Sequence, residues 1–394
     1  MRKGPNYPNG KTFAFSIVDD ADGGTVANLK PVYDLLYDLG FRTTKTVWLQ
    51  RGSNPDHFGA DSQTLEDEEY LQFVLELQRQ GFEIAMHMAA PGTSRRSETI
   101  SAYQTFKKVL GHYPKININH FANAENIYWG RDRLDSPFLQ ALYNRVTGWG
   151  QFWGHVEGSK FFWGDICQRY TKYVRNFTFQ SINTLRVNPG MPYHDDRRPY
   201  VNYWFSSSDG ADVERFNRLI SERNQERLLR EKGCCIVYTH FGKDFVEGEK
   251  LNATWERLMK KLAQKNGWFV PASELLDFLL ARNTVVVNII PDRNWNIPDR
   301  QQREIKLAKL HDCIQACRRR SLAIIIGTEM NKYGQRFVDD LKVPFLSPYA
   351  EDFLQGGLFV CGHSFATHCG PWSYFSEWAE HYFCLLYTSP SPRD

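Results

Sequence analysis

The chain has 394 residues, of which 42% are hydrophobic and 24% charged, so it can build a large core and is not globally disordered. Its formal net charge of +3 argues against nucleic-acid binding driven by bulk charge. The apolar runs are shorter than the about 18 residues of a transmembrane helix, and residues 1–15 lack the apolar run of a secretory leader, so we expect neither feature. The eight cysteines lack metal-type spacing, so we expect reduced thiols and a cytoplasmic protein that binds neither nucleic acid nor membrane.

Apolar segments alternate with amphipathic segments through most of the chain. The repeated order of strand then helix predicts parallel strands joined by crossover helices, in either an α/β barrel or an open sheet. Apolar runs predict strands at 12–20, 43–49, 82–87, 115–121, 201–206, 234–240 and 268–270. Helical spacing predicts helices at 26–39, 64–80, 97–110, 137–146, 211–230, 253–264 and 273–280.

Polar side chains close four of the expected strands. Asp19 and Asp20 end the first, and His87, His120 and His240 end later ones. In a parallel barrel the C-terminal strand ends converge on one face, which carries the chemistry. A single histidine at such a position is more often structural, and the two aspartates would also suit the Gly-rich turn that follows them. Four strands that end in metal-binding or proton-transferring groups together favour a functional site.

Four segments carry a family resemblance. They read FSIVDDAD at 15–22, GFEIAMH at 81–87, VYTHFGKDF at 237–245 and GWFVPASELLDFLL at 267–280. Their order and spacing resemble the polysaccharide deacetylase (NodB-homology) family of the glycoside hydrolase/deacetylase superfamily. The resemblance spans residues 11–283 and implies a distorted (β/α) TIM-like barrel. Residues 284–383 continue the pattern of strands and helices, so we expect a C-terminal α/β extension there.

The resemblance implies roles for individual residues. Asp19 matches the general base of the family and Asp20 its metal-ligating aspartate. His87 matches the first metal-ligating histidine, and His240 matches the histidine that protonates the leaving group. The expected fold therefore brings together a base, an acid and a metal site.

Three parts of the family pattern differ in this sequence. One is the Arg-Pro-x-Tyr segment of the family, where this chain reads INHFANAEN at 118–126. A second metal-ligating histidine normally stands four residues after the first, where this chain has Pro91. The alternation of strands and helices instead suggests His120 as the third ligand. The fourth family motif is echoed only by YWFSSSDGAD, where Asp209 or Asp212 is a candidate to orient a catalytic group.

We therefore expect a metal-dependent hydrolase that removes an acyl group from an N- or O-acylated sugar, or hydrolyses another small C–N amide bond. The expected cofactor is a divalent metal, Zn²⁺ foremost, which suits mixed nitrogen and oxygen ligands. Two alternatives stay open. One is a catalytically inactive carbohydrate-binding barrel. The other is a metal-dependent hydrolase or isomerase of an anionic metabolite, anchored by Arg95 and Arg96.

Two further segments of the sequence each allow two interpretations. The aromatic stretch around Trp149, Phe152, Trp153 and Trp163 suits either a sugar-stacking platform or a packed lid. Residues 384–394 read CLLYTSPSPRD, which resembles a translated sequencing adapter, so we expect residues 284–383 to be a truncated extension. The alternative for 384–394 is a disordered tail rich in proline and serine.

Overall fold

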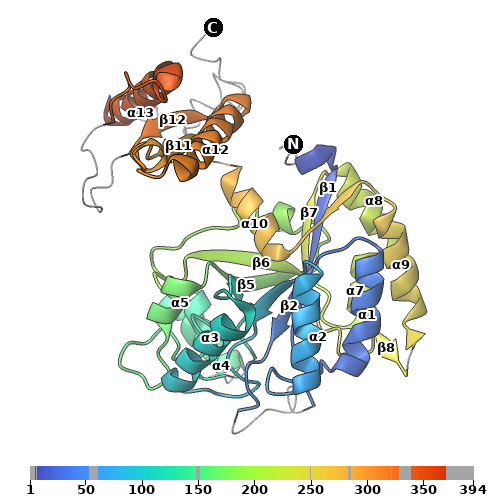
Figure 1. Cartoon of the computed structure of the whole chain (residues 1–394). Coiled ribbons are helices and arrows are strands. Elements are labelled where there is room, and N and C mark those ends of the chain that lie inside the picture. Colours follow the sequence, from blue (N-terminus) through green and yellow to red (C-terminus); the bar gives the residue numbers. More distant parts are fainter. Residues whose placement is uncertain are drawn as a thin grey trace. The chain divides into compact units, whose positions relative to one another are not determined.

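The computed structural model describes residues 5, 7–52, 61–121, 123–147, 151–248, 250–282, 285–320, 322–327 and 339–369. Internal contacts divide the chain into two compact units, Met1–Arg282 and Asn283–Asp394 (Figure 1). Trp149 and residues 384–394 lie outside the described residues.

The first unit is built on a closed ring of parallel strands. Within the described residues, seven strands pair in sequence order, and β7 pairs back onto β1 from Ala14 with Cys234 to Asp19 with Thr239. An eighth strand, β10 (Gly267–Phe269), pairs with Phe13–Phe15 at the start of β1. This confirms the expected distorted (β/α) barrel. The ring consists of β1 (Phe13–Asp19), β2 (Thr44–Val47), β3 (Glu83–Met86), β4 (Ile116–Asn117), β5 (Tyr173–Phe179), β6 (Tyr203–Asp209) and β7 (Cys234–Thr239).

Helices follow the strands and cover the ring. Several begin at side chains that accept a backbone N–H, as with Thr25 before α1 and Asp212 before α7. The helix expected at 211–230 is two helices, α7 and α8, separated at Ile220 and Ser221. The helices of this unit are α1 (Val26–Asp38), α2 (Glu68–Arg79), α3 (Arg96–Leu110), α4 (Pro137–Thr147), α5 (Gly164–Tyr170), α6 (Thr184–Val187), α7 (Val213–Leu219), α8 (Glu222–Arg230), α9 (Ala253–Ala263) and α10 (Ala272–Ala281), with short 3-10 helices η1 (Pro8–Gly10) and η2 (Gly130–Arg133).

The two faces of the ring bury different sets of side chains. On β1, Phe13, Phe15 and Ile17 pack in the core that also holds the inward side of α1. Ala14 and Val18 instead join a second core with residues of β4, β6, β7 and α10. Because successive strand residues point to opposite faces, the first set faces the helices and the second faces the inside of the barrel. The same alternation decides which polar side chains at the strand ends reach the barrel mouth.

The second unit is a small α/β arrangement with its own core. Strands β11 (Val286–Ile289) and β12 (Ala323–Ile326) pair in parallel along their full length. Its core includes Ile289, Leu310, Ile314 and Ile324. This confirms the expected α/β character of the extension. Its helices are α11 (Asp292–Trp295), α12 (Arg300–Arg319) and α13 (Ala350–Cys369), with the short 3-10 helix η3 (Ser347–Tyr349).

Two further expectations concern membranes and thiols. In the part of the chain that the structure describes, every helix is too short or too polar to cross a bilayer. Cys234 and Cys235 are free thiols buried in β7, and burial raises the pKa of both.

A small antiparallel pair, β8 (Val246–Glu247) and β9 (Lys250–Leu251), follows β7.

Candidate metal centre and catalytic site

The site lies where the strands of the barrel end. His87, His120 and His240 follow β3, β4 and β7, and Arg175 lies within β5. Each occupies the alternating position that faces the inside of the barrel, as do Ala85, Ile118, Tyr173 and Ile236 in the interior core. The strands therefore direct side chains that are distant in sequence toward one place at the barrel mouth, the face that carries chemistry in parallel barrels.

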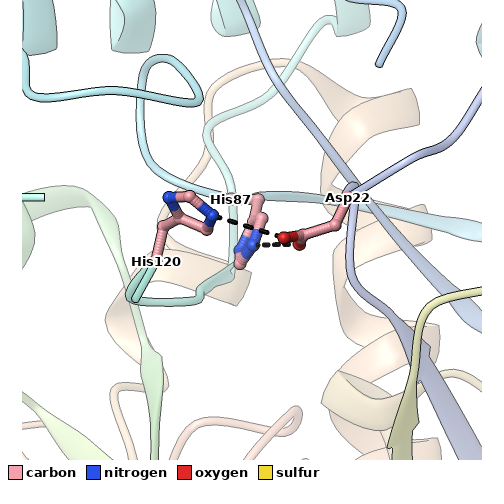
Figure 2. A group of neighbouring side chains, drawn as sticks. All are labelled: Asp22, His87 and His120. Carbon is pink, nitrogen blue, oxygen red and sulfur yellow. Dashed lines mark hydrogen bonds and ion pairs between the residues drawn. The ribbon is translucent and has the colours of Figure 1, made fainter. Parts of the chain in front are cut away.

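Asp22, His87 and His120 form a buried cluster, shown in Figure 2. His87 Nε2 lies 3.1 Å from one carboxylate oxygen of Asp22, and His120 Nε2 lies 3.3 Å from the other. One ligand atom from each residue lies within 4.8 Å of the other two. The two histidine side chains are 2% exposed and that of Asp22 is 6% exposed. Two imidazoles and a carboxylate at this spacing form a donor set that suits Zn²⁺ and related divalent ions.

The hydrogen bonds of Asn123 fix the protonation of His120. The amide nitrogen of Asn123 donates to the carbonyls of Ala90 and Gly92 and to Glu125 Oε1, so its oxygen must face His120 Nδ1, 3.2 Å away. Nδ1 of His120 is then the donor. In the neutral ring, Nε2 therefore directs a lone pair at a carboxylate oxygen of Asp22, an arrangement that needs a cation or proton between the two atoms.

The charges in the cluster favour neutral histidine and ionised aspartate. Burial lowers the pKa of His87, which keeps the imidazole neutral and able to bind a metal. Burial would raise the pKa of Asp22, but its interactions with His120 and His87 hold that pKa well below the usual range. These are the protonation states that metal ligands require.

Asp22 reaches the cluster through a tight turn. The chain leaves β1 and turns at Ala21–Gly24, where the N–H of Gly24 donates to the carbonyl of Ala21 at 3.1 Å. Gly23 has a φ of +68°, a conformation that glycine adopts without strain. In Figure 2 the Asp22 carboxylate points toward the rings of His87 and His120, the residues that follow β3 and β4.

Asp20 is held by Arg175. Both carboxylate oxygens accept from the guanidinium, with Nη1 to Oδ1 at 2.9 Å, and the two side chains form a buried ion pair. Burial would raise the pKa of Asp20, but the charge of Arg175 holds it below the usual value. The Arg175 guanidinium also lies over the ring of Tyr238, 4.6 Å from its centroid. Asp20 is therefore an ionised carboxylate with a fixed orientation.

His240 is the third histidine at the barrel mouth. Its Nδ1 lies 2.6 Å from the carbonyl oxygen of Ala211, so Nδ1 is a donor and Nε2 points the other way. Nε2 lies 3.6 Å from Asp22 Oδ2 and 4.0 Å from Asp20 Oδ2. A histidine in this position can carry a proton on Nε2 at the edge of the cluster.

Asp19 lies on the opposite face of β1. Its carboxylate is 2.8 Å from Lys45 Nζ, and it accepts hydrogen bonds from Tyr33 Oη at 3.0 Å and from the N–H of Phe241 at 2.8 Å. Asp19 and Lys45 are fully buried between the sheet and the helices. Burial would lower the pKa of Lys45, but the charge of Asp19 raises it, so the pair is ionic. Asp19 fixes the backbone beside His240 and does not face the barrel mouth.

The structure thus brings together some of the residues expected from the sequence and separates others. His87, His120 and His240 meet at the mouth, and Asp20 lies beside them. The carboxylate shared by His87 and His120 belongs to Asp22, whereas sequence analysis selected Asp20 for that place and Asp19 for the base. Face alternation explains the difference, because Asp19 continues the helix-facing set of Phe13, Phe15 and Ile17.

Sequence analysis also missed Arg175, because no strand was expected at 173–179. The segment reads YVRNFTF, rich in the β-branched and aromatic residues that favour strands. For Asp22 a signal was present in the Asp-Gly-Gly turn that follows β1. Of the two aspartates considered as orienting groups, Asp209 accepts from the N–H of Ala211, and Asp212 caps α7. The carbonyl of Ala211, between them, is what orients His240.

Arg95 and Arg96 were suggested as an anion site, but the Arg96 side chain is engaged within the protein. Arg96 donates two hydrogen bonds to Asp165, at 2.6 and 2.7 Å, and a third to the carbonyl of Phe162. The backbone N–H of Arg95 donates to Glu98 at the start of α3. Arg96 therefore joins α3 to α5, as part of the scaffold.

The aromatic stretch divides between core and surface. Trp163 is fully buried, and its indole N–H donates to the carbonyl of Glu125 at 2.6 Å. Phe152 is also buried, whereas Trp153 is 38% exposed. The described part of this stretch therefore packs against the segment that carries Asn123 and Glu125.

No protein-family model matches the sequence, and no curated protein matches it. Solved structures similar to this chain include a Mycobacterium smegmatis protein assigned as a polysaccharide deacetylase, with 10% identity, a TM-score of 0.42, and coverage of 71% of this chain and 94% of that one. Peptidoglycan deacetylase PdaC from Bacillus subtilis shows 9% identity, a TM-score of 0.33, and coverage of 70% and 94%. A family 4 acetyl xylan esterase from Clostridium thermocellum, in complex with a cobalt ion, shows 12% identity, a TM-score of 0.34, and coverage of 67% and 91%. Similarity at this level carries no argument about activity, which rests on the site itself.

Proposed function

We propose that the chain is a metal-dependent hydrolase that removes an acyl group from an N- or O-acylated sugar. The observation that carries the proposal is the cluster of Asp22, His87 and His120, in which His120 directs a lone pair at a carboxylate oxygen. A base and an acid, Asp20 and His240, lie beside that cluster at the barrel mouth. Binding, acid and base groups brought together in one place are what hydrolysis needs.

Asp22, His87 and His120 would hold the cation, with Zn²⁺ as the expected ion. A divalent cation there would lower the pKa of a bound water toward about 7 and polarise an acyl carbonyl. The buried ligands leave the exposed side of the cluster, next to His240, for water and substrate. His240 is 15% exposed, more than any of the three proposed ligands.

Asp20 is the proposed base, and this assignment replaces Asp19. It is ionised, fixed by Arg175 and directed at the mouth, so it can accept the proton of the attacking water. His240 is the proposed acid, because the carbonyl of Ala211 fixes Nδ1 as donor and leaves Nε2 to give a proton to the leaving nitrogen or oxygen. The 4.0 Å between Asp20 Oδ2 and His240 Nε2 lets the proton return from base to acid after each turnover.

The sugar part of the proposal rests on the motif resemblance. Phe121, which directly follows His120 in the sequence, is 47% exposed, and an exposed aromatic ring suits the apolar face of a sugar. The anionic-metabolite alternative is weakened because the guanidinium of Arg96 is engaged by Asp165.

An activity panel tests the proposal. Protein stripped with a chelator and reloaded with Zn²⁺ or Co²⁺ would be assayed on N-acetylated and O-acetylated oligosaccharides, and on phosphorylated and carboxylated metabolites. We expect release of acetate from at least one acetylated sugar, dependent on metal, and abolished in Asp20→Asn and His240→Ala. Asp34→Asn, an exposed ion-paired aspartate on α1, is the matched control and should retain full activity.

Two results would contradict the proposal. A metal-loaded protein that binds oligosaccharides but hydrolyses none would be a binding barrel. Turnover confined to anionic metabolites would assign the site to another hydrolase or isomerase.

A further inference from the structure

The turn after β7 carries a second cationic side chain at the site. Lys243 lies three residues after His240, and its N–H donates to the carbonyl of His240 at 2.9 Å. Its Nζ lies 3.9 Å from Asp22 Oδ1, the same oxygen that faces His120 Nε2. The Lys243 side chain is 33% exposed, whereas the three proposed metal ligands are almost completely buried. Lys243 therefore borders the exposed side of the cluster.

The backbone of this turn is clamped to the turn that carries Asp22. The amide nitrogen of Asn28 donates to the carbonyl of Gly23 at 2.8 Å and to that of Gly242 at 3.4 Å. A Cβ at Gly242 would collide with the backbone of Gly23 and Gly24, so the two turns lie in direct contact. Phe241 is fully buried, and its N–H donates to Asp19. Lys243 is thus placed by a rigid pair of turns, which a residue that acts on substrate requires.

The charges around Lys243 change when the cluster holds a cation. Asp22 then shares its negative charge with the cation as well as with Lys243. A negatively charged oxygen formed on the exposed side is the group that both the cation and the ammonium would attract. Hydrolysis of an acyl group forms such an oxygen, because the carbonyl π pair moves onto the acyl oxygen when the water oxygen bonds to carbon.

We propose that Lys243 is a catalytic residue that binds the acyl oxygen in its negatively charged form. The inference rests on the proposed function. The Lys243 ammonium donates a hydrogen bond and transfers no proton: the water proton goes to Asp20, and His240 protonates the leaving atom. When the acyl oxygen re-forms its double bond, the bond from carbon to nitrogen or oxygen breaks, and the carboxylic acid that remains releases its proton to solvent and becomes a carboxylate. Lys243 then faces that carboxylate, so it also binds the product.

The test has a binding arm and a kinetic arm, both on the full chain loaded with Co²⁺. In the binding arm, acetate is titrated and followed by the visible spectrum of Co²⁺. We expect Lys243→Ala to weaken acetate binding by about 10-fold or more, because a hydrogen bond to a charged group is lost. In the kinetic arm, 4-nitrophenyl acetate is the neutral acyl probe. We expect Lys243→Ala to lower kcat by about 10²-fold with little change in KM, and Lys243→Arg to restore part of it.

Lys250→Ala is the matched control, since it removes an exposed lysine from β9 in the same segment and should match wild type in both arms. Equal acetate affinity and kcat in wild type and Lys243→Ala would overturn the inference while leaving the proposed function intact. The same losses in Lys250→Ala would also overturn it, because the effect would then be one of overall charge. A wild-type chain that takes up no Co²⁺ would overturn the proposed function itself.

Discussion

Two buried charged groups lie on opposite faces of the same strand end. On the helix side, Asp19 is neutralised by Lys45 and accepts from Tyr33 and Phe241. On the barrel side, Asp22 faces two histidines, one of which directs a lone pair at it. Lys45 neutralises the charge of Asp19. Asp22 instead needs a cation or a proton between its oxygen and His120 Nε2. Burial of a carboxylate therefore does not identify a functional site, but the set of partners around it does.

Asp20 lies between these two cases. It has a full ionic partner in Arg175, as Asp19 has in Lys45, yet it lies at the mouth within 4.0 Å of His240. A fixed, ionised carboxylate at the open end of a barrel suits proton transfer, whereas the same pairing beneath the helices suits structure. Variants of each carboxylate in turn test whether Asp19 is structural and Asp20 catalytic.

The largest effect is expected on catalysis from Asp20→Asn. The amide cannot accept the proton of the attacking water, so activity on an acetylated sugar should fall by about 10²–10⁴-fold. The metal content should stay close to wild type, because Asp22, His87 and His120 are unchanged. The free energy of unfolding should fall, because the buried Arg175 guanidinium loses its ionic partner. Full activity in this variant would remove Asp20 from the mechanism.

The next effect is on stability, from Asp19→Asn. It leaves the buried Lys45 ammonium without its ionic partner, so we expect a loss of about 3–5 kcal/mol in the free energy of unfolding. Urea denaturation measures this loss. The double variant Asp19→Asn/Lys45→Met removes both charges and should recover part of it. If Asp19→Asn unfolds like wild type but loses its activity, Asp19 belongs to the catalytic group and the comparison fails.

A smaller effect concerns Glu125, behind the metal cluster. Burial raises the pKa of Glu125 to about 8, from 4.5 in the unfolded chain. The folded state therefore keeps a proton that the unfolded state loses, and this stabilisation is complete below pH 4.5 and lost as pH rises through about 8. Between pH 6 and 8, Glu125→Gln should remove a slope of at most about 1.4 kcal/mol per pH unit in the free energy of unfolding. The exposed Glu214→Gln should keep the wild-type slope, and an unchanged slope in Glu125→Gln would contradict the assignment.

The smallest effect is expected from Arg175→Lys. Lysine keeps the positive charge but cannot form the two-bond fork to Asp20, so the pKa of Asp20 should rise. Because Asp20 acts as the ionised base, the acid limb of the pH profile for kcat/KM should move to higher pH, by up to about one unit. An unshifted limb would mean that Asp20 does not control it.

The alternation of strands and helices predicted an α/β fold, either a barrel or an open sheet, because apolar runs that end in polar residues are a strong local signal. The motif resemblance selected the barrel. The strand that carries Arg175 was missed, since its middle contains Arg175 and Asn176 and it lacks a continuous apolar run. The histidines were placed correctly at strand ends. The choice among Asp19, Asp20 and Asp22 depends on which face each side chain occupies and on a turn, and both are tertiary facts.

One pattern in the sequence could have improved the choice between Asp19 and Asp20. On β1, the bulky Phe13, Phe15 and Ile17 alternate with the smaller Ala14, Ser16 and Val18. A closed barrel with a narrow interior favours the smaller set inside. That alternation assigns Asp19 to the helix side and Asp20 to the mouth without coordinates. The pairings of Lys45 with Asp19 and of Arg175 with Asp20 could not be predicted, because they join strands that are distant in sequence.

The central claim is that Asp22, and not Asp19 or Asp20, completes a metal site with His87 and His120. Elemental analysis of purified protein after Zn²⁺ loading and dialysis tests it most directly, on wild type, Asp22→Ala, His120→Ala and Asp34→Ala. We predict one bound ion per chain in wild type and Asp34→Ala, and none in the other two, with all four folded by circular dichroism. Retention of the ion by folded Asp22→Ala, or a wild-type chain without metal, would contradict the account.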